Sequence, residues 1–219
     1  MPLVIGVTGS IATGKSYLCK YLVERYAAVH ADVDTLVHRM YDPGAEAFAR
    51  IVEAFGPEVV GRDGYIDRRI LGGMVFGSPE QALVLRNAIG DYASEVKKLV
   101  DHWRAELPVG QLAVLGAFNL VEGHYNEWCD TNWLLRAEDA IVLERIRARN
   151  GLSEGEAHAR LSSARPWQVR AHACDRIIDN NGDVKEFESA IDAALAETLQ
   201  WRDTADLQED SGRYRSSGL

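Results

Sequence analysis

The sequence predicts an α/β protein in which a parallel sheet lies between two layers of helices. Five short apolar segments have the length of strands, and they span residues 3–8, 27–31, 112–117, 132–137 and 176–179. The first and third of them are almost continuously apolar, which is typical of parallel strands that are covered on both faces. Helical patterns separate most of these segments. This alternation favours one doubly wound sheet of five strands.

The first predicted strand runs directly into Gly9-Ser-Ile-Ala-Thr-Gly-Lys-Ser16, which has the spacing of a phosphate-binding P-loop. Its glycines let successive backbone N–H groups point at phosphate oxygens, and the helix that follows directs its positive end at the same anion. Lys15 adds a positive charge, and the Ser16 hydroxyl is suited to Mg²⁺. The residues that we expect to contact the nucleotide here are Gly9, Ser10, Ile11, Ala12, Thr13, Gly14, Lys15, Ser16 and Tyr17.

The P-loop alone does not separate kinases, GTPases and ATP-driven machines. The sequence lacks the Asn-Lys-x-Asp motif that reads guanine, which argues against a GTPase. A chain of 219 residues is also short for most ATP-driven machines. We therefore expect a small-molecule kinase that uses ATP.

Two acidic residues, Asp32 and Asp34, follow the second predicted strand. Ligands of doubly wound sheets bind beyond the carboxyl ends of the strands, so Asp32 should lie near the phosphates. A kinase that acts on a hydroxyl needs a carboxylate to orient that hydroxyl and accept its proton. An aspartate at such a position is equally suited to cap the next helix. Both roles stay open, and one residue could cap while the other catalyses.

The long segment 34–107 contains no convincing strand and reads as helices. Ser78-Pro79-Glu80-Gln81 is a helix start signal, with a capping serine and a proline in the first turn. Apolar residues then follow at helical spacing as far as Trp103, interrupted at Gly90-Asp91, where we expect a bend. A helical lobe is therefore predicted between the second and third strands.

Two further helices are predicted in the C-terminal part of the chain. Ser153-Glu-Gly-Glu156 has the pattern of a capping box and should open a helix near residue 153, within an arginine-rich stretch from 145 to 176. The last helix is expected over 184–201. The polar segment 203–219 that follows is expected to be a flexible tail.

The composition narrows the classes of partner and compartment. The net charge of −9 argues against a nucleic-acid partner, and it requires that the cations of a nucleotide site be gathered locally. Three widely spaced cysteines argue against a disulfide framework and favour a reducing, cytoplasmic compartment. No apolar stretch approaches the roughly 20 residues of a membrane span, so we expect no membrane association.

Several motifs occur in an order that resembles the dephospho-coenzyme A kinase family. The P-loop with its preceding Thr8 and the acidic pair Asp32-Val-Asp34 resemble the N-terminal motifs of that family. The further motifs that carry the resemblance are Asp42-Pro-Gly44, Phe55-Gly56, Gly64-Tyr-Ile-Asp-Arg68, Val75-Phe76, Gly151-Leu-Ser153 with Ala157 and Arg160, and Ile178-Asp-Asn-Asn-Gly182. The resemblance covers roughly residues 3 to 200.

The resemblance implies a three-layer P-loop fold with a helical substrate-binding insertion and a helical lid. The core would comprise 1–33, 108–145 and 174–202, the acceptor-binding lobe 34–107 and the lid 146–173. Asp32 would be the general base on the ribose 3′-hydroxyl of dephospho-CoA, with Lys15 and Arg145 as the other catalytic residues. Arg145 and Asn181 would contact ATP, and Mg²⁺ would accompany it. The protein would be a monomer or a small homo-oligomer.

Glu122 closes the segment after the third strand, where this fold often places an acid for Mg²⁺ or its water shell. It is equally suited to start a loop.

The sequence departs from the family pattern at Gly90, Asp91, Phe118, Asn119, Val142 and Ala164. These positions belong to the acceptor lobe and the lid, whereas the P-loop and Asp32 are intact. Two alternatives to a dephospho-CoA kinase are therefore retained. One is a related kinase that acts on another nucleotide-like alcohol, and the other is a nucleotide-binding regulator without transfer activity.

Overall fold

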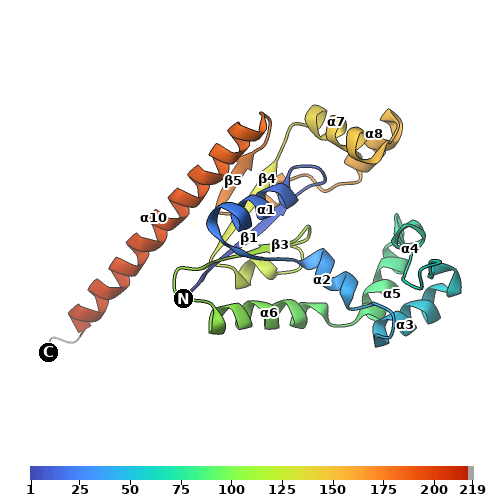
Figure 1. Cartoon of the computed structure of the whole chain (residues 1–219), viewed down its shortest axis with the longest axis horizontal. Helices are drawn as coiled ribbons and strands as arrows, with labels where there is room; N and C mark the ends of the chain where they lie inside the picture. The colour runs from blue at the N-terminus through green and yellow to red at the C-terminus, as the bar shows by residue number, and fades with distance from the viewer. Residues whose placement is uncertain (217–219) are drawn as a thin grey trace.

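The computed structural model describes residues 1–216, except for the side chains of residues 150, 203 and 205–216. Its centre is one parallel sheet in the order β2-β3-β1-β4-β5 (Figure 1). The strands are β1 (Leu3–Gly9), β2 (Val29–Asp32), β3 (Leu112–Gly116), β4 (Thr131–Arg136) and β5 (Arg176–Asp179). The five-stranded parallel sheet predicted from the sequence is thus confirmed, with strand ends that differ by one or two residues.

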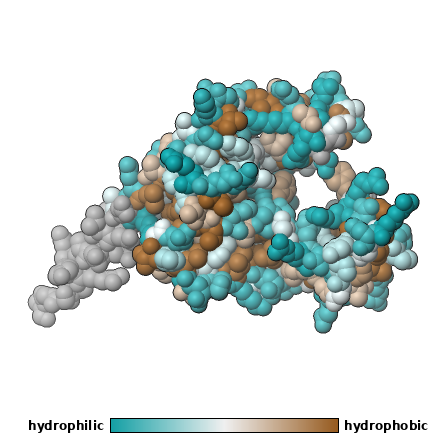
Figure 2. Space-filling model, in the orientation of Figure 1, coloured by the Kyte–Doolittle hydropathy of each residue, from teal (hydrophilic) through white to brown (hydrophobic). Residues whose placement is uncertain are grey.

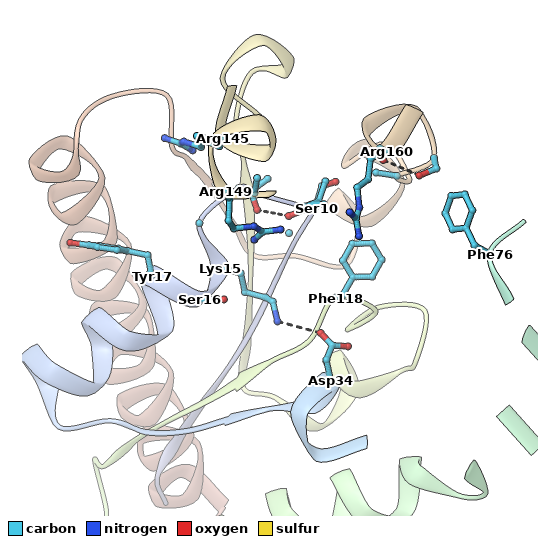
Figure 3. Close-up of a pocket in the computed structure, with 18 residues that line it drawn as sticks. Ser10, Lys15, Ser16, Tyr17, Asp34, Phe76, Phe118, Arg145, Arg149 and Arg160 are labelled. Atoms are coloured by element: carbon cyan, nitrogen blue, oxygen red, sulfur yellow. Dashed lines mark hydrogen bonds and ion pairs between the residues drawn. The ribbon is translucent and has the colours of Figure 1, made fainter. Parts of the chain in front are cut away.

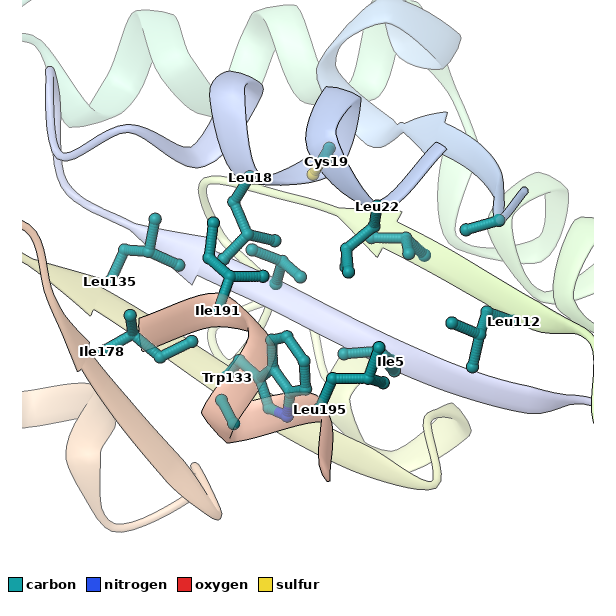
Figure 4. Close-up of a cluster of buried hydrophobic side chains, with 14 of the residues drawn as sticks. Ile5, Leu18, Cys19, Leu22, Leu112, Trp133, Leu135, Ile178, Ile191 and Leu195 are labelled. Carbon is teal, nitrogen blue, oxygen red and sulfur yellow. The ribbon is translucent and has the colours of Figure 1, made fainter. Parts of the chain in front are cut away.

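Helices α1 (Lys15–Tyr26) and α10 (Val184–Ser216) cover one face of the sheet. Leu18 and Leu22 of α1 and Ile191 of α10 pack against β1 and β4 in one buried cluster (Figure 4). Trp133 of β4 is fully buried among them. Because α1 packs on this face, its first residues and the end of the P-loop lie at the carboxyl end of β1.

The opposite face of the sheet is covered by α6 (Tyr92–Glu106) and by the short 3₁₀-helix η2 (Tyr125–Trp128). Val96 and Val100 of α6 are buried against Ala113 and Leu115 of β3. The helix α6 therefore belongs to the core of the sheet by its contacts, although it lies within the segment 34–107.

A helical lobe precedes α6. It contains α2 (Val33–Arg39), α3 (Glu46–Phe55), the 3₁₀-helix η1 (Pro57–Val59), α4 (Arg68–Val75) and α5 (Pro79–Ile89). Helices α3, α4 and α5 share a separate apolar core around Ile51 and Leu71. Figure 1 shows these helices at the side of the sheet, joined to it through α2 and α6.

The expected bend at Gly90-Asp91 is instead a break between two helices. Gly90 ends α5 with a φ angle of 92°, a conformation that suits glycine, and the Asp91 side chain caps α6 by accepting from the Ser94 N–H. The predicted cap at Ser78 is confirmed, because its hydroxyl accepts from the Gln81 N–H at 3.3 Å.

Three helices lie between β4 and β5: α7 (Asp139–Asn150), α8 (Glu154–Ser162) and α9 (Gln168–Ala171). We call the segment 146–173, which contains the end of α7 together with α8 and α9, the lid. The predicted capping box at Ser153 and Glu156 opens α8. Val142 and Ile146 of α7 pack against Ala157 of α8 and are flanked by Ile11 of the P-loop. Figure 2 shows the molecule hollowed between this lid and the helical lobe.

Helix α10 extends to Ser216 and thus well beyond residue 201, where the sequence pattern suggested its end. Residues 217–219 of the expected flexible tail lie outside the described residues, and the flexibility of 203–219 stays a prediction. Within residues 1–216, no helix combines the length and the apolar character that crossing a bilayer requires.

Candidate functional site

The turn between β1 and α1 has the backbone conformation of an anion-binding loop. Ala12 and Gly14 both have positive φ angles, 59° and 104°, and a Cβ atom at Gly14 would collide with the amide nitrogen of Asn180. The Thr13 hydroxyl donates to the Ser10 carbonyl at 2.9 Å and holds the turn closed. Helix α1 begins at Lys15, so its unpaired N–H groups face the same space.

This turn forms the floor of a cleft with a volume of about 1020 Å³. The cleft is lined by the eight P-loop residues and Tyr17, and by Asp34, Phe76, Phe118, Arg145, Ala148, Arg149, Arg160, Ser163 and Ala164. Figure 3 shows side chains from the P-loop, the lid and the lobe around one space. The cleft contains Lys15 and three arginines in a chain of net charge −9, so cations are gathered locally as the sequence predicted.

Lys15 and the two aspartates after β2 lie together. Lys15 Nζ donates to Asp32 Oδ2 at 2.7 Å and lies 3.7 Å from Asp34 Oδ2. The sheet register explains this meeting, because Asp32 is level with Gly116 of β3, and Gly116 is level with Val7 of β1. The carboxyl ends of β1 and β2 therefore reach the same edge of the sheet.

Asp32 also caps α2, since its Oδ1 atom accepts from the Thr35 N–H at 3.0 Å. One carboxylate thus caps through one oxygen and pairs with Lys15 through the other. Burial by itself raises the pKa of Asp32, but the hydrogen bond and charge of Lys15 and the Thr35 donors outweigh it and hold the pKa below its usual value. Asp32 is therefore ionised at neutral pH. Asp34 lines the cleft directly, whereas Asp32 reaches it through Lys15.

Arg145 of α7 lines the cleft beside the P-loop, and its guanidinium points toward Asn180. Its Nη2 atom donates to Asn180 Oδ1 at 3.2 Å, and its buried Nη1 atom has no hydrogen-bond partner among the described residues. Because a buried guanidinium donor without a partner is costly, this atom is suited to a ligand oxygen.

The structure assigns different positions to the two asparagines after β5. Asn180 is buried, and it donates to the Thr13 carbonyl at 2.9 Å while it accepts from Arg145. Asn181, which the sequence resemblance placed at ATP, accepts from the Glu138 N–H and does not line the cleft. The contact of Asn180 with the P-loop was not predicted from the sequence. The only indication in the sequence is that Asn180 stands beside Asn181 in the motif Ile178-Asp-Asn-Asn-Gly182.

Two other expected residues have strong internal partners. The Tyr17 hydroxyl donates to Glu188 of α10 at 2.6 Å, and this hydrogen bond raises the pKa of Tyr17 to about 12. Glu122 accepts from Arg170 Nε at 2.8 Å and lies 3.4 Å from Arg165 Nη1. Glu122 does not line the cleft. It connects the loop after β3 with the base of the lid.

The groups in the cleft fit a magnesium–nucleotide complex. Mg²⁺ is usually bound by one or two protein oxygens together with phosphates and water, so an all-protein cage is not required. Ser16, at the start of α1, offers a hydroxyl, and Asp34 offers a carboxylate. The described residues contain no cluster of three or more acidic, histidine or cysteine side chains that would hold a metal alone.

The sequence matches the family model of dephospho-CoA kinase over residues 3–186. It is 37% identical over 193 residues to a dephospho-CoA kinase of Symbiobacterium thermophilum, with 87% of this chain and 79% of the relative covered. It is 31% identical over 188 residues to a dephospho-CoA kinase of Synechocystis sp., with 86% and 92% covered.

A crystal structure of a Thermus thermophilus protein has a similar fold. The TM-score is 0.69 at 28% sequence identity, and the match covers 90% of this chain and 97% of the other. The family model accounts for the P-loop, the lobe, the lid and all five strands in one continuous match. This chain therefore belongs to the dephospho-CoA kinase family.

Proposed function

We propose that this protein transfers the γ-phosphoryl group of ATP to the ribose 3′-hydroxyl of dephospho-CoA, which gives ADP and coenzyme A. The observation that carries the proposal is the meeting of Lys15 and Asp32 at the mouth of the P-loop, within a chain of the dephospho-CoA kinase family. The P-loop supplies a site for the donor phosphates, and the carboxylates supply a site for an alcohol.

In the proposed reaction, Asp32 accepts the proton of the 3′-hydroxyl as the oxygen bonds to the γ-phosphorus. The bond between that phosphorus and the β,γ-bridging oxygen breaks, and ADP leaves with the bridging oxygen. Asp32 is suited to this step because Lys15 and the Thr35 donors keep it ionised at neutral pH until the nucleotide binds. The ATP phosphates compete with Asp32 for Lys15, so nucleotide binding frees the carboxylate for the acceptor.

The remaining cations of the cleft are proposed to neutralise phosphate charge. Backbone N–H groups from Gly9 to Ser16 surround the β-phosphate, and the unpartnered Nη1 of Arg145 meets a γ-phosphate oxygen. We propose that Ser16 holds Mg²⁺, which neutralises the β- and γ-phosphate oxygens when bound. Glu122 is a weaker candidate for the metal, because it does not line the cleft and its Oε1 atom already pairs with Arg170 and Arg165.

We assign a role in this reaction to each segment of the chain. We propose that 34–107 contributes the acceptor-binding lobe, with its last helix α6 packed on the sheet. We propose further that 146–173 is the lid over the phosphates and that the remaining segments to residue 202 form the core. A second cavity of about 710 Å³ in the lobe supports the first assignment by its size and place. Its charged lining residues have both signs: Arg62 and Arg68 with Asp42, Asp63 and Asp67. The three unpaired cysteines support a reducing compartment, which we propose is the cytoplasm.

A coupled assay of ADP release tests the function. With ATP and Mg²⁺ present, we expect ADP formation that depends on dephospho-CoA, and coenzyme A as the second product. ADP formed only with another alcohol would favour the related kinase, and no acceptor-dependent ADP would favour the regulator. The match to the dephospho-CoA kinase family model over residues 3–186 favours neither the related kinase nor the regulator.

A further inference from the structure

An exposed aromatic ring lines the cleft and has no role in the proposed reaction. Phe118 lines the cleft and is 39% exposed, although an aromatic side chain of this size gains from burial. It follows β3 by two residues, and β3 lies between the strands that carry the P-loop and Asp32. Its ring is therefore next to the space where the acceptor hydroxyl must lie.

One face of this ring is already covered. The Arg170 guanidinium lies over the ring, with Cζ 4.7 Å from the ring centroid. Arg170 is 1% exposed, so the accessible face of Phe118 is the one turned away from Arg170. A cation on one face of an aromatic ring is a favourable contact, and it leaves the other face free to stack.

Hydrogen bonds fix the positions of both Arg170 and Phe118. Arg170 Nε donates to Glu122 at 2.8 Å, and the Phe118 carbonyl accepts from the buried Thr8 hydroxyl at 3.1 Å. Thr8 lies on β1 directly before the P-loop. The orientation of Phe118 is thus tied to the strand that positions the phosphates.

A second exposed ring faces the same cleft from the lobe. Phe76 is 72% exposed and is located at the end of α4 (Figure 3). Large exposed aromatic rings that gather in one concave site mark a binding surface for an apolar or planar ligand. Asp34 and Lys15 line the cleft with them, so this ligand must also carry a group for the reaction centre.

We propose that Phe118, backed by Arg170, is the stacking platform for the adenine of the acceptor, with Phe76 as a second aromatic wall. The proposal rests on the proposed function, because dephospho-CoA is an alcohol whose reactive ribose carries a purine. A purine that stacks on Phe118 places the attached ribose toward Asp34 and Lys15. Phe118 thereby determines which acceptors bind, while ATP is held by the P-loop and the lid.

The test is the substitution Phe118→Leu, with Phe118→Trp as the conservative variant. Stacking of a base on an aromatic side chain is worth about 5- to 150-fold in affinity. In Phe118→Leu, the KM for dephospho-CoA should therefore rise at least about 5-fold, while the KM for ATP stays unchanged. Phe118→Trp should keep the wild-type KM for the acceptor. The control is Trp201→Leu, an exposed aromatic residue of α10 outside both cavities, which should change neither KM.

A calorimetric titration of dephospho-CoA into each protein gives a readout that does not depend on turnover. Loss of acceptor affinity in Phe118→Leu, recovered in Phe118→Trp, supports the platform. Equal affinity in wild type and Phe118→Leu, in an active enzyme, overturns the platform and leaves the function standing. A rise in the KM for ATP alone also overturns it, because Phe118 would then bind the donor base. A wild-type protein that neither binds nor phosphorylates dephospho-CoA overturns both proposals.

Discussion

The Lys15 ammonium and the Asp32 carboxylate lie 2.7 Å apart, so the expected phosphate ligand and the expected base form one ion pair. Lys15 follows β1 and Asp32 ends β2, and β3 lies between these two strands. Substitution of each residue by itself therefore tests the two roles, phosphate binding by Lys15 and proton transfer by Asp32, separately.

Replacement of Asp32 by Asn should reduce turnover by about 10²- to 10⁴-fold, the usual contribution of a general base. ATP affinity should stay close to that of the wild type, because the P-loop backbone is unchanged. Steady-state ADP release and a nucleotide titration measure the two effects. Asp34→Asn is the matched control, since Asp34 also lies near Lys15. A larger loss of turnover in Asp34→Asn than in Asp32→Asn would transfer the base role to Asp34.

Replacement of Lys15 by Met should raise the pKa of Asp32. Burial, which raises this pKa, remains in the variant, while the hydrogen bond and charge that oppose it are removed. In the wild type, the ionised Asp32 contributes stability that is fully present above the unfolded pKa of about 3.8 and is lost as pH falls through the lower folded value. In the variant, the folded pKa lies closer to the unfolded value, so this contribution should be smaller and its loss should be complete at a higher pH. Carboxyl NMR titration and urea unfolding at several pH values measure both effects, and an unshifted Asp32 titration would contradict the prediction.

Replacement of Glu122 by Gln should destabilise the fold by about 3 kcal/mol, because it leaves the almost fully buried Arg170 without its carboxylate. Urea unfolding gives this value. Glu127→Gln is the control: the pair of Glu127 with His124 is exposed, so the change should be within about 0.5 kcal/mol. An equally small effect in Glu122→Gln, with a changed magnesium dependence of turnover, would support a metal role instead.

The sheet and the P-loop could be predicted because their signals are local. Apolar runs such as 3–8 and 112–117 have the length of buried strands, and the glycines of the P-loop fix its backbone. The roles of Asp32 could not be separated from the sequence, since capping and pairing use different oxygens of one carboxylate. Those roles depend on the register of β2 beside β3, which is a long-range property.

Contacts between distant segments account for what the sequence did not predict. Glu122 was considered for the metal, but its partner Arg170 is 48 residues away and no local pattern connects them. A bend was predicted at Gly90-Asp91 because the apolar positions continue at helical spacing across it. The apolar residues before it are buried in the core of the lobe, whereas those after it are buried against the sheet, so two separate helices form. In each of these cases, the partner was decided by packing between elements rather than by residue type.

The neighbouring asparagines Asn180 and Asn181 give the most direct test of the site geometry. Asn180→Ala removes the hydrogen bonds to the Thr13 carbonyl and to Arg145, and it leaves these buried groups without partners. An unsatisfied buried group costs about 1–3 kcal/mol, so both stability and ATP affinity should fall, the latter by about 10-fold or more. Asn181→Ala removes one exposed hydrogen bond to Glu138 and should change ATP affinity little. Nucleotide titration and urea unfolding of the two variants measure these effects. If Asn181→Ala lost ATP affinity and Asn180→Ala kept it, the nucleotide contact would belong to Asn181. The conformation of the P-loop would then not depend on the hydrogen bond from Asn180 to the Thr13 carbonyl.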